Sequence, residues 1–171
     1  MNAATDVDAL TQKNKEAIGK ALGRIASGVY IVTVGQGDEK DGMLATWVSQ
    51  VAFEPPILSI VVKKERPILS KLSFGSKLIV NVLGKGNMEI FKKFAKPFAS
   101  IAEGMSRFDG LAVADNADGP VLSDSVAFLS CSVLTQTAAG DHIVVLAQVL
   151  DGALLQADEP MVHLRSNGFQ Y

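Results

Sequence analysis

Cysteine and histidine are scarce in this sequence of 171 residues, and their scarcity removes two common kinds of site. The single cysteine, Cys131, cannot form an internal disulfide, and its setting in the apolar run AFLSCSVL favours a small buried hydrophobe over a nucleophile. The two histidines, His142 and His163, have no cysteine or carboxylate at ligand spacing, so the sequence predicts no metal site.

The sequence also lacks a strong charge and a long apolar run. Sixteen basic and 18 acidic residues give a formal net charge of −2, which removes any general case for nucleic-acid binding. No uninterrupted run approaches the roughly 20 apolar residues that a membrane helix needs, and residues 1–20 lack the apolar core of a signal peptide. We therefore expect a cytoplasmic protein that contacts neither nucleic acid nor membrane.

Two motif classes are missing as well. The segment GQGDEKDG has neither the spacing of a phosphate-binding glycine loop nor a helical pattern after it, and it is typical of a hairpin turn. No serine lies in a nucleophile elbow, and the carboxylates fall in turns, so hydrolysis by an acid-base pair has no candidate residues. What remains is a binding surface.

The apolar content, 48% of residues, is enough for the core of one domain. Three- and four-residue apolar steps predict an amphipathic helix over residues 7–27, ending at Gly28, and a second one around Ile90 and Phe94. Between and after them lie five or six strand-like runs, the last two of them long and joined by AAGD, in no alternating strand-helix rhythm. The pattern predicts a mainly β fold, an antiparallel barrel with a few capping α-helices.

The stretch GMLATWVSQVAFEPP, residues 42–56, carries the only tryptophan. Strand alternation would place Met43, Trp47 and Ser49 on one face, while Thr46 and the rest of the alternate set share the other, so each face carries polar groups. One interpretation is a barrel strand that crosses from core to rim, with Trp47 in the core. The other is a ligand-binding surface formed by Trp47 and the hydroxyl groups.

Cationic and amide groups elsewhere in the sequence could complete such a ligand-binding surface. Lys63-Lys64-Glu65-Arg66 follows the next strand, Asn81 interrupts the apolar strand KLIVNVL, and Lys92-Lys93-Phe94 lies on the second helix. Together they would suit a planar ring that carries a phosphate. The alternatives are that Lys63-Lys64-Glu65-Arg66 is a solvent-exposed turn, that Asn81 hydrogen-bonds to the backbone, and that the lysines of the second helix lie on its solvent-exposed face.

The order of the pieces resembles the flavin reductase-like family, which has an FMN-binding split barrel. The resemblance runs from about Lys20 to Tyr171 and rests on these segments in this order: GRIASGVYIVTV, GMLATWVSQVAFEPPILSIVV, KLIVNVL, FAK, RFDG, GPVLSDSVAFLSCSV, GDHIVVLAQV and HLRSNGFQY. Within the family, KERPILS, WVSQ and SNGFQY are similar to the C-terminal flavin reductase module of cyanobacterial and plastid flavodiiron proteins. The resemblance implies a Greek-key split barrel over residues 21–171, after an N-terminal helical extension or linker over residues 1–20.

The resemblance also implies a site. It places the strand at residues 45–51 along the flavin, two cations near the phosphate, and the histidine of G-D-H near the docked nicotinamide. The implied flavin-binding residues are Ala45, Thr46, Trp47, Val48, Ser49, Gln50, Lys64, Arg66, Asn81, Val82, Leu83 and Phe94, and the implied catalytic residue is His142. Lys92 and Lys93 are the alternative cations for the phosphate, and a surface position at the end of a hairpin is the plain alternative for His142.

The function that the resemblance implies is hydride transfer from NAD(P)H to FMN in a homodimer. Electrons would pass on to fused or docked di-iron and flavodoxin-like domains. A second hypothesis is an FMN electron-transfer protein that a protein donor such as ferredoxin reduces. A third is a barrel that has lost flavin and serves only in dimerisation.

Overall fold

The structure is a computed structural model that describes residues 14–97 and 104–169. The chain forms two compact units. One comprises Gly28–Met161, and the other comprises the N-terminal residues up to Ser27 together with Val162–Tyr171. All the predicted site residues belong to the unit Gly28–Met161.

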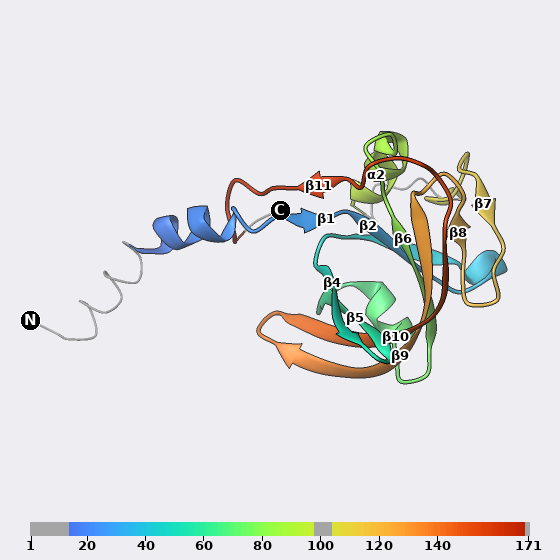
Figure 1. The fold of residues 1–171 in the computed structure, drawn as a ribbon, viewed down its shortest axis with the longest axis horizontal. Helices are drawn as coiled ribbons and strands as arrows, with labels where there is room; N and C mark the ends of the chain where they lie inside the picture. The colour runs from blue at the N-terminus through green and yellow to red at the C-terminus, as the bar shows by residue number, and fades with distance from the viewer. Residues whose placement is uncertain (1–13, 98–103, 170–171) are drawn as a thin grey trace, which may run out of the picture. The chain divides into compact units, whose positions relative to one another are not determined.

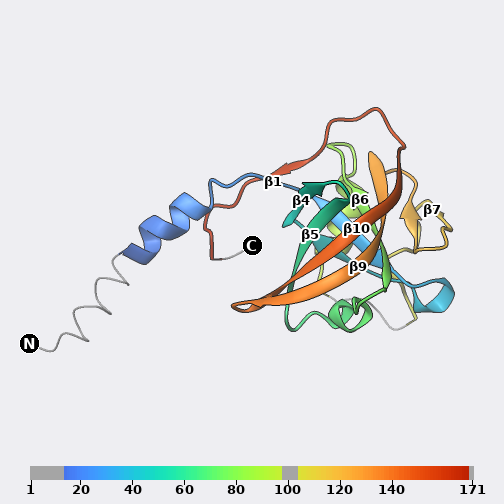
Figure 2. The same ribbon diagram turned by 60° about the horizontal axis from the view of Figure 1, so that its bottom comes forward.

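An antiparallel sheet makes up most of this unit, as predicted, but it has seven strands rather than five or six (Figures 1 and 2). The strand order is β3-β2-β6-β9-β10-β5-β4. The strands are β2 (Tyr30–Val34), β3 (Asp41–Ala45), β4 (Val48–Phe53), β5 (Pro56–Lys63), β6 (Lys77–Val82), β9 (Ala127–Ala139) and β10 (His142–Leu154). The predicted hairpins are confirmed, since GQGDEKDG joins β2 to β3 and AAGD joins β9 to β10.

The sheet curls because its two edge strands are neighbours in the sequence. β3 forms one edge and β4 the other, yet only Thr46 and Trp47 separate them along the chain. The long strands β9 and β10 have register shifts between Leu146 and Ala147 and between Val149 and Asp151, which lets them bend around the barrel. The fold is the split barrel that the sequence predicts.

The prediction of one continuous strand through residues 45–51 is wrong. β3 ends at Ala45 and β4 begins at Val48, with a bend at Thr46. Met43 and Ala45 point into the main core, and so does Val48, so the alternation of faces changes at the bend. The physical reason is closure of the barrel, which requires the chain to leave one edge of the sheet and join the other.

The barrel interior is a single apolar cluster. Its members come from every strand of the sheet, and Cys131 is among them, fully buried as predicted. Burial raises the pKa of the Cys131 thiol to about 12, so this sulfur remains a neutral, unreactive side chain at neutral pH. The buried members are Val32, Val34, Met43, Ala45, Val48, Leu58, Ile60, Val62, Ile68, Leu72, Leu78, Val80, Cys131, Val133, Val145 and Ala147.

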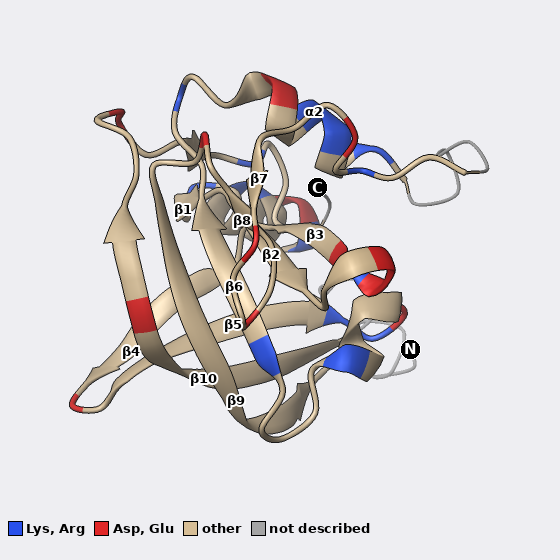
Figure 3. Cartoon of the chain, turned by 90° about the vertical axis from the view of Figure 1, so that its right-hand side faces the viewer, with Lys and Arg blue, Asp and Glu red and all other residues tan. Residues whose placement is uncertain are grey.

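Short helices cap the sheet. The 3-10 helices η1 (Gly37–Glu39) and η2 (Pro67–Lys71) follow β2 and β5, and α2 (Met88–Ala95) follows β6. Buried Ile90 and Phe94 of α2 join a second apolar cluster with Val29, Ile31 and Leu83. Lys92 and Lys93 lie in the last turn of α2, and the strands of the sheet carry few charged residues (Figure 3).

The polar excursion over residues 106–124 is fastened to the sheet. It contains the short strands β7 (Val113–Ala114) and β8 (Val121–Leu122), which pair with each other. Thr33 donates a 2.6 Å hydrogen bond to the Pro120 carbonyl, and Ser130 donates to the Asp118 carboxylate. These bonds hold the excursion against β2 and β9.

The second unit holds the N-terminal helix, which spans residues 14–22 in the described part of the chain. The predicted end at Gly28 is wrong, and residues 7–13 lie outside the described residues. Gly28 instead belongs to the short strand β1 (Ser27–Gly28). The unit also contains β11 (Val162–His163), and the Gly168 N–H donates a 2.7 Å hydrogen bond to the Gly19 carbonyl. A side chain on Gly168 would overlap Leu22, so the close approach requires glycine.

Candidate functional site

The site begins at the bend where the chain crosses between the edges of the barrel. Ala45 and Val48 anchor the two sides of the bend in the core, and the Trp47 carbonyl accepts a 2.9 Å hydrogen bond from the Val61 N–H. Thr46 and Trp47 are therefore held by fixed neighbours on both sides. A rigid two-residue crossing of this kind positions side chains more narrowly than a long loop would.

Thr46 carries a buried hydroxyl that no described residue satisfies. The residue is 4% exposed, and its Oγ1 has no hydrogen-bond partner in the described part of the chain. Leaving a hydroxyl buried without a partner costs about 1–3 kcal/mol, so such a group calls for an explanation. A ligand that hydrogen-bonds to Thr46 would supply one.

The second group is His142, the first residue of β10. Its imidazole lies 5.1 Å from the Trp47 ring, centroid to centroid, with the two planes tilted by 46°. Only 12% of its side chain is exposed. Its Nε2 is buried, and among the described residues it has no hydrogen-bond partner. The structure thus brings together Trp47 and His142, which the sequence separates by more than ninety positions.

Asp141 fixes the other nitrogen of this imidazole. The His142 Nδ1 and the Asp141 Oδ1 lie 2.8 Å apart, and this hydrogen bond, more than the charge of nearby Lys63, holds the pKa of the Asp141 carboxyl below its usual range. An ionised carboxylate only accepts, so Nδ1 carries the proton. In the neutral imidazole, Nε2 is then a hydrogen-bond acceptor.

The remaining residues of the A-T-W-V-S-Q segment differ in exposure. Val48 is buried in the core, whereas Ser49 and Gln50 are exposed on the edge strand β4. Gln50 donates a 3.1 Å hydrogen bond to the Ala52 carbonyl of its own strand, and the Ser49 carbonyl accepts one from Ser59. The hydroxyl of Ser49 and the edge of β4 face solvent.

Lys64 and Arg66, the predicted phosphate cations, are exposed where β5 leads into η2. Arg66 lines a small pocket of about 20 Å³ with Asp41 and Arg107. Arg107 is buried, and its guanidinium donates to the carbonyls of Phe94 (3.2 Å) and Lys96 (3.0 Å) at the end of α2. Burial, and then the charge of Arg66, lower the pKa of Arg107.

Sequence reasoning missed Arg107. It lies in the quoted segment RFDG, but its partners are main-chain carbonyls, which leave no sequence pattern.

Asn81 is buried, and its amide is satisfied inside the chain. Its Nδ2 donates to the Ile31 carbonyl at 3.1 Å and to the Thr33 hydroxyl at 3.2 Å, while its Oδ1 accepts from the Leu122 N–H at 2.8 Å. The alternative that backbone pairs with Asn81 is therefore what the structure shows. Contact between Asn81 and a flavin stays a prediction.

The other predicted residues near Asn81 are also interior. Leu83 is fully buried, Val82 is half-buried, and Phe94 packs edge-on against Phe108 at 5.5 Å. Phe94 also closes the space beside Gly42, where an added Cβ would lie 2.8 Å from its ring. Leu83 and Phe94 therefore belong to the interior rather than to an open surface.

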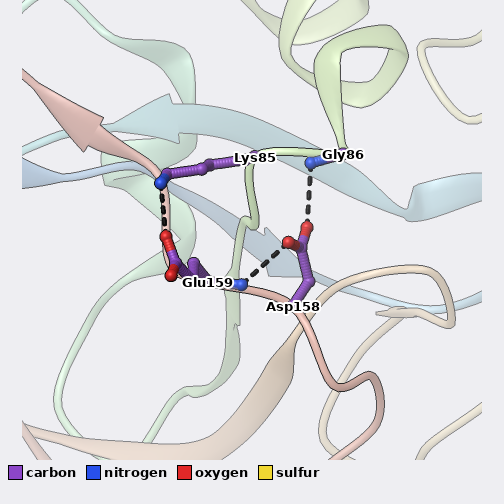
Figure 4. A network of polar contacts seen from close by, with 4 residues as sticks. All are labelled: Lys85, Gly86, Asp158 and Glu159. Atoms are coloured by element: carbon purple, nitrogen blue, oxygen red, sulfur yellow. Dashed lines mark hydrogen bonds and ion pairs between the residues drawn. The ribbon is translucent and has the colours of Figure 1, made fainter.

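A polar network fixes the loop between β6 and α2 (Figure 4). Asp158 accepts 2.8 Å hydrogen bonds from the main-chain N–H groups of Gly86 and Glu159, and Glu159 pairs with Lys85. Gly84 and Pro160, in the same two segments, form an isolated antiparallel β-bridge. The end of β6 is thus held in place by a segment more than seventy residues away.

Two open hollows lie elsewhere, with volumes of about 380 and 340 Å³. Both are lined by the turn after β2, including Gly35 and Gln36, and by the excursion near Ala117. Neither includes a predicted site residue. The unsatisfied atoms of Thr46 and His142 place the candidate site at the bend, because no described residue that lines the two hollows has a buried side-chain atom without a hydrogen-bond partner.

Within the described ranges, no group of three or more His, Cys, Asp or Glu side chains could hold a metal ion. Among the same residues, no helix is long and apolar enough to cross a membrane.

Comparison with known proteins gives a consistent family. The flavin reductase like domain family matches residues 22–170. The chain is 39% identical over 155 residues to diflavin flavoprotein A 1 of Synechocystis sp., covering 89% of this chain and 26% of that protein. It is 40% identical to putative diflavin flavoprotein A 6 of Nostoc sp., with 89% and 27% covered. The chain spans about a quarter of the length of the curated relatives it matches.

Solved structures show the same fold. NADH:FAD oxidoreductase SgcE6 of Streptomyces globisporus, in complex with NAD and FAD fragments, superposes with a TM-score of 0.75 at 26% identity, covering 95% of this chain and 90% of that one. The flavin reductase PheA2 superposes with a TM-score of 0.72 at 23% identity, covering 86% and 90%.

Proposed function

The chain belongs to the flavin reductase like family of oxidoreductases, and from that premise we propose that it binds FMN and reduces it with NAD(P)H. The single observation that carries the proposal is the Thr46–Trp47 bend. There a buried hydroxyl and, on His142 beside Trp47, a buried imidazole nitrogen have no hydrogen-bond partner in the described part of the chain. These residues fit a planar ligand with hydrogen-bonding edges.

The protein's share of the chemistry is positioning. FMN, when bound, accepts a hydride from the nicotinamide, and this chemistry belongs to the two cofactors. Thr46 would hydrogen-bond the flavin from the bend, and the side chains of Ala45 and Val48 would hold that bend rigid through core packing. Trp47 and His142 would form one wall of the space for the nicotinamide and exclude water from it.

Cations near the bend would hold the phosphate of FMN. Lys64 and Arg66 are exposed and follow β5, the strand that pairs with β4. The pocket that Arg66 lines with the buried Arg107 and with Asp41 has a volume of about 20 Å³, which suits a water rather than a phosphate. The phosphate would therefore bind at the exposed side chains of Lys64 and Arg66. Phosphate at Lys92 or Lys93 of α2 remains the alternative.

Thr46→Val tests the proposal, because valine keeps the shape of threonine and removes only the hydroxyl. FMN affinity should fall roughly fivefold to tenfold, the effect of one hydrogen bond. The flavin-free chain should keep its stability or gain about 1 kcal/mol, since an unsatisfied hydroxyl is removed. Titration with FMN and urea unfolding measure the two effects.

Thr33→Val is the matched control. Thr33 is equally buried, but its hydroxyl already donates to Pro120, so this variant should lose stability and keep its FMN affinity. If Thr46→Val binds FMN as tightly as the unchanged chain, the bend does not contact the flavin and the proposal fails.

We also propose a homodimer, which would form through the edge strand β4 rather than through α2. The apolar face of α2 is used within the chain, since Phe94 is buried and Phe91 is half-buried. The exposed apolar side chains include Val51 and Phe53 of edge strand β4, 53% and 89% exposed. Light scattering that shows a flavin-loaded monomer at micromolar concentration would exclude the dimer.

Because the matched relatives are about four times longer, we propose that reduced FMN passes electrons to further domains of the di-iron and flavodoxin-like kinds. Mixing the reduced chain anaerobically with the rest of the Synechocystis relative tests this. Reoxidation of the chain's flavin supports the transfer, and a flavin that stays reduced contradicts it.

A further inference from the structure

The hydrogen bond between Asp141 and His142 determines which chemical group a ligand must present to His142. Asp141 is the last residue of the turn that joins β9 to β10, and 73% of its side chain is exposed. His142 is the first residue of β10, and 12% of its side chain is exposed. An exposed carboxylate therefore holds the orientation of an imidazole that is largely buried.

The turn itself is fixed, so the direction of the imidazole is fixed too. The Asp141 carbonyl accepts a 3.1 Å hydrogen bond from the Lys64 N–H, and His142 lies opposite Lys63 in the β5–β10 pairing. The Trp47 ring on the other side, 5.1 Å away, prevents the imidazole from turning freely. The charge of Lys63 acts on the Asp141 carboxylate, and Lys63 itself forms an exposed ion pair with Glu65 at 3.6 Å.

With the Nδ1 proton directed to Asp141, the buried Nε2 of the neutral imidazole offers a lone pair and no proton. A ligand group that satisfies it must be a hydrogen-bond donor. The carboxamide NH₂ of nicotinamide is such a donor, and it is attached to a flat ring that suits the space beside an indole. The flavin ring also has one N–H, so the two ligands must be separated by experiment.

We propose that Asp141 is a positioning residue that keeps the His142 proton on Nδ1, so that Nε2 accepts a hydrogen bond from the carboxamide NH₂ of the nicotinamide. The inference rests on the proposed function, which supplies NAD(P)H as the reductant. It adds a role for Asp141, which would act on the ligand only through His142, by determining whether the Nε2 of His142 accepts or donates a hydrogen bond.

The first experiment needs neither flavin nor nucleotide. Nitrogen-15 NMR of the flavin-free, full 171-residue chain reports which imidazole nitrogen of neutral His142 carries the proton. The unchanged chain should show the proton on Nδ1, Asp141→Ala should move it toward Nε2, and Asp141→Asn should retain it because the amide oxygen still accepts. Glu65→Ala, which removes a neighbouring charge without touching the imidazole, should leave the tautomer unchanged. A tautomer that does not change in Asp141→Ala would overturn the proposal.

The second experiment compares NADH with its reduced 3-acetylpyridine analogue, in which a methyl group replaces the carboxamide NH₂. The ratio of the two second-order rate constants for reduction of bound FMN is measured in each variant, so intrinsic differences between the nucleotides cancel. Asp141→Ala and His142→Ala should each lower the preference for NADH by roughly fivefold to tenfold, the effect of one hydrogen bond. The double variant should lower it no further, because the two residues act as a unit. Asp141→Asn should restore most of the preference.

Several results would contradict the assignment. An unchanged preference in both alanine variants would show that Nε2 does not contact the carboxamide. Loss of FMN affinity in the same variants, with the preference intact, would assign Nε2 to the flavin instead. Failure of NADH and NADPH to reduce even the unchanged chain would refute the proposed function, whereas the dependence of the His142 tautomer on Asp141 is measured without any nucleotide.

Discussion

Replacing Asn81 with alanine tests how the structure uses its one buried amide inside the barrel strand β6. The side chain is fully buried and makes three hydrogen bonds, at 3.1, 3.2 and 2.8 Å. Alanine removes all three at once. One of the three is the bond from the Leu122 N–H of the excursion, which is left without its acceptor.

The magnitude follows from these contacts. A buried N–H without a partner costs about 1–3 kcal/mol, and each of the other two bonds contributes about 1 kcal/mol. Because the groups share one network, the effects overlap, and the free energy of unfolding should fall by about 2–4 kcal/mol. The loss should appear in the flavin-free chain, where no ligand contact contributes.

Urea unfolding of the flavin-free chain, followed by circular dichroism and by the fluorescence of the single tryptophan, measures this loss. Asn116→Ala is the control, because Asn116 accepts one local bond, from the Asp118 N–H, and should cost less than about 1 kcal/mol. A cycle with Thr33→Val should give a coupling of about 0.5–1.5 kcal/mol. An Asn81→Ala loss below about 1 kcal/mol would show that the three bonds of Asn81 do not stabilise the chain, and it would refute the network.

Two further predictions concern the phosphate cations and the loop after β6. Replacing Lys64 and Arg66 together with alanine should weaken FMN far more than riboflavin, because only FMN carries the phosphate, and a charge-assisted contact contributes about 1.5–3 kcal/mol; equal losses in titrations with both flavins would place the phosphate elsewhere. Gly84→Ala should cost about 1–3 kcal/mol in urea unfolding, since the new Cβ would lie 2.4 Å from the Asp158 carboxylate. The control Gly86→Ala meets the same oxygen at 3.2 Å and should cost less than about 1 kcal/mol; equal costs would contradict the tight packing at Gly84.

The strands of the barrel were predictable because their signals are local. Alternating apolar runs separated by GQGDEKDG and AAGD led to the correct hairpins, and the apolar setting of Cys131 led to its correct burial. The bend at Thr46 was not predictable in the same way. It exists because β3 and β4 occupy opposite edges of a sheet that closes on itself, and closure is a property of the whole sheet.

The candidate site was likewise predictable only where its signals are local motifs in the sequence. Order of motifs along the chain was enough to single out Thr46, Trp47 and His142, and the structure brings the last two into contact. Arg107 was missed because its partners are carbonyls at the end of α2, which any sequence could supply. The partners of Asn81 come from β2 and β8, so only the folded chain shows that its amide is already in use.

Anaerobic stopped-flow reduction of the FMN-loaded chain is the measurement that tests the proposed activity most directly. Mixing with NADH or NADPH should bleach the flavin's visible absorbance, and His142→Ala should slow this reduction while dithionite still reduces both proteins at equal rates. If dithionite bleaches the flavin and neither nucleotide does, the chain is not an NAD(P)H-dependent reductase, and a protein electron donor would be the remaining source of its electrons.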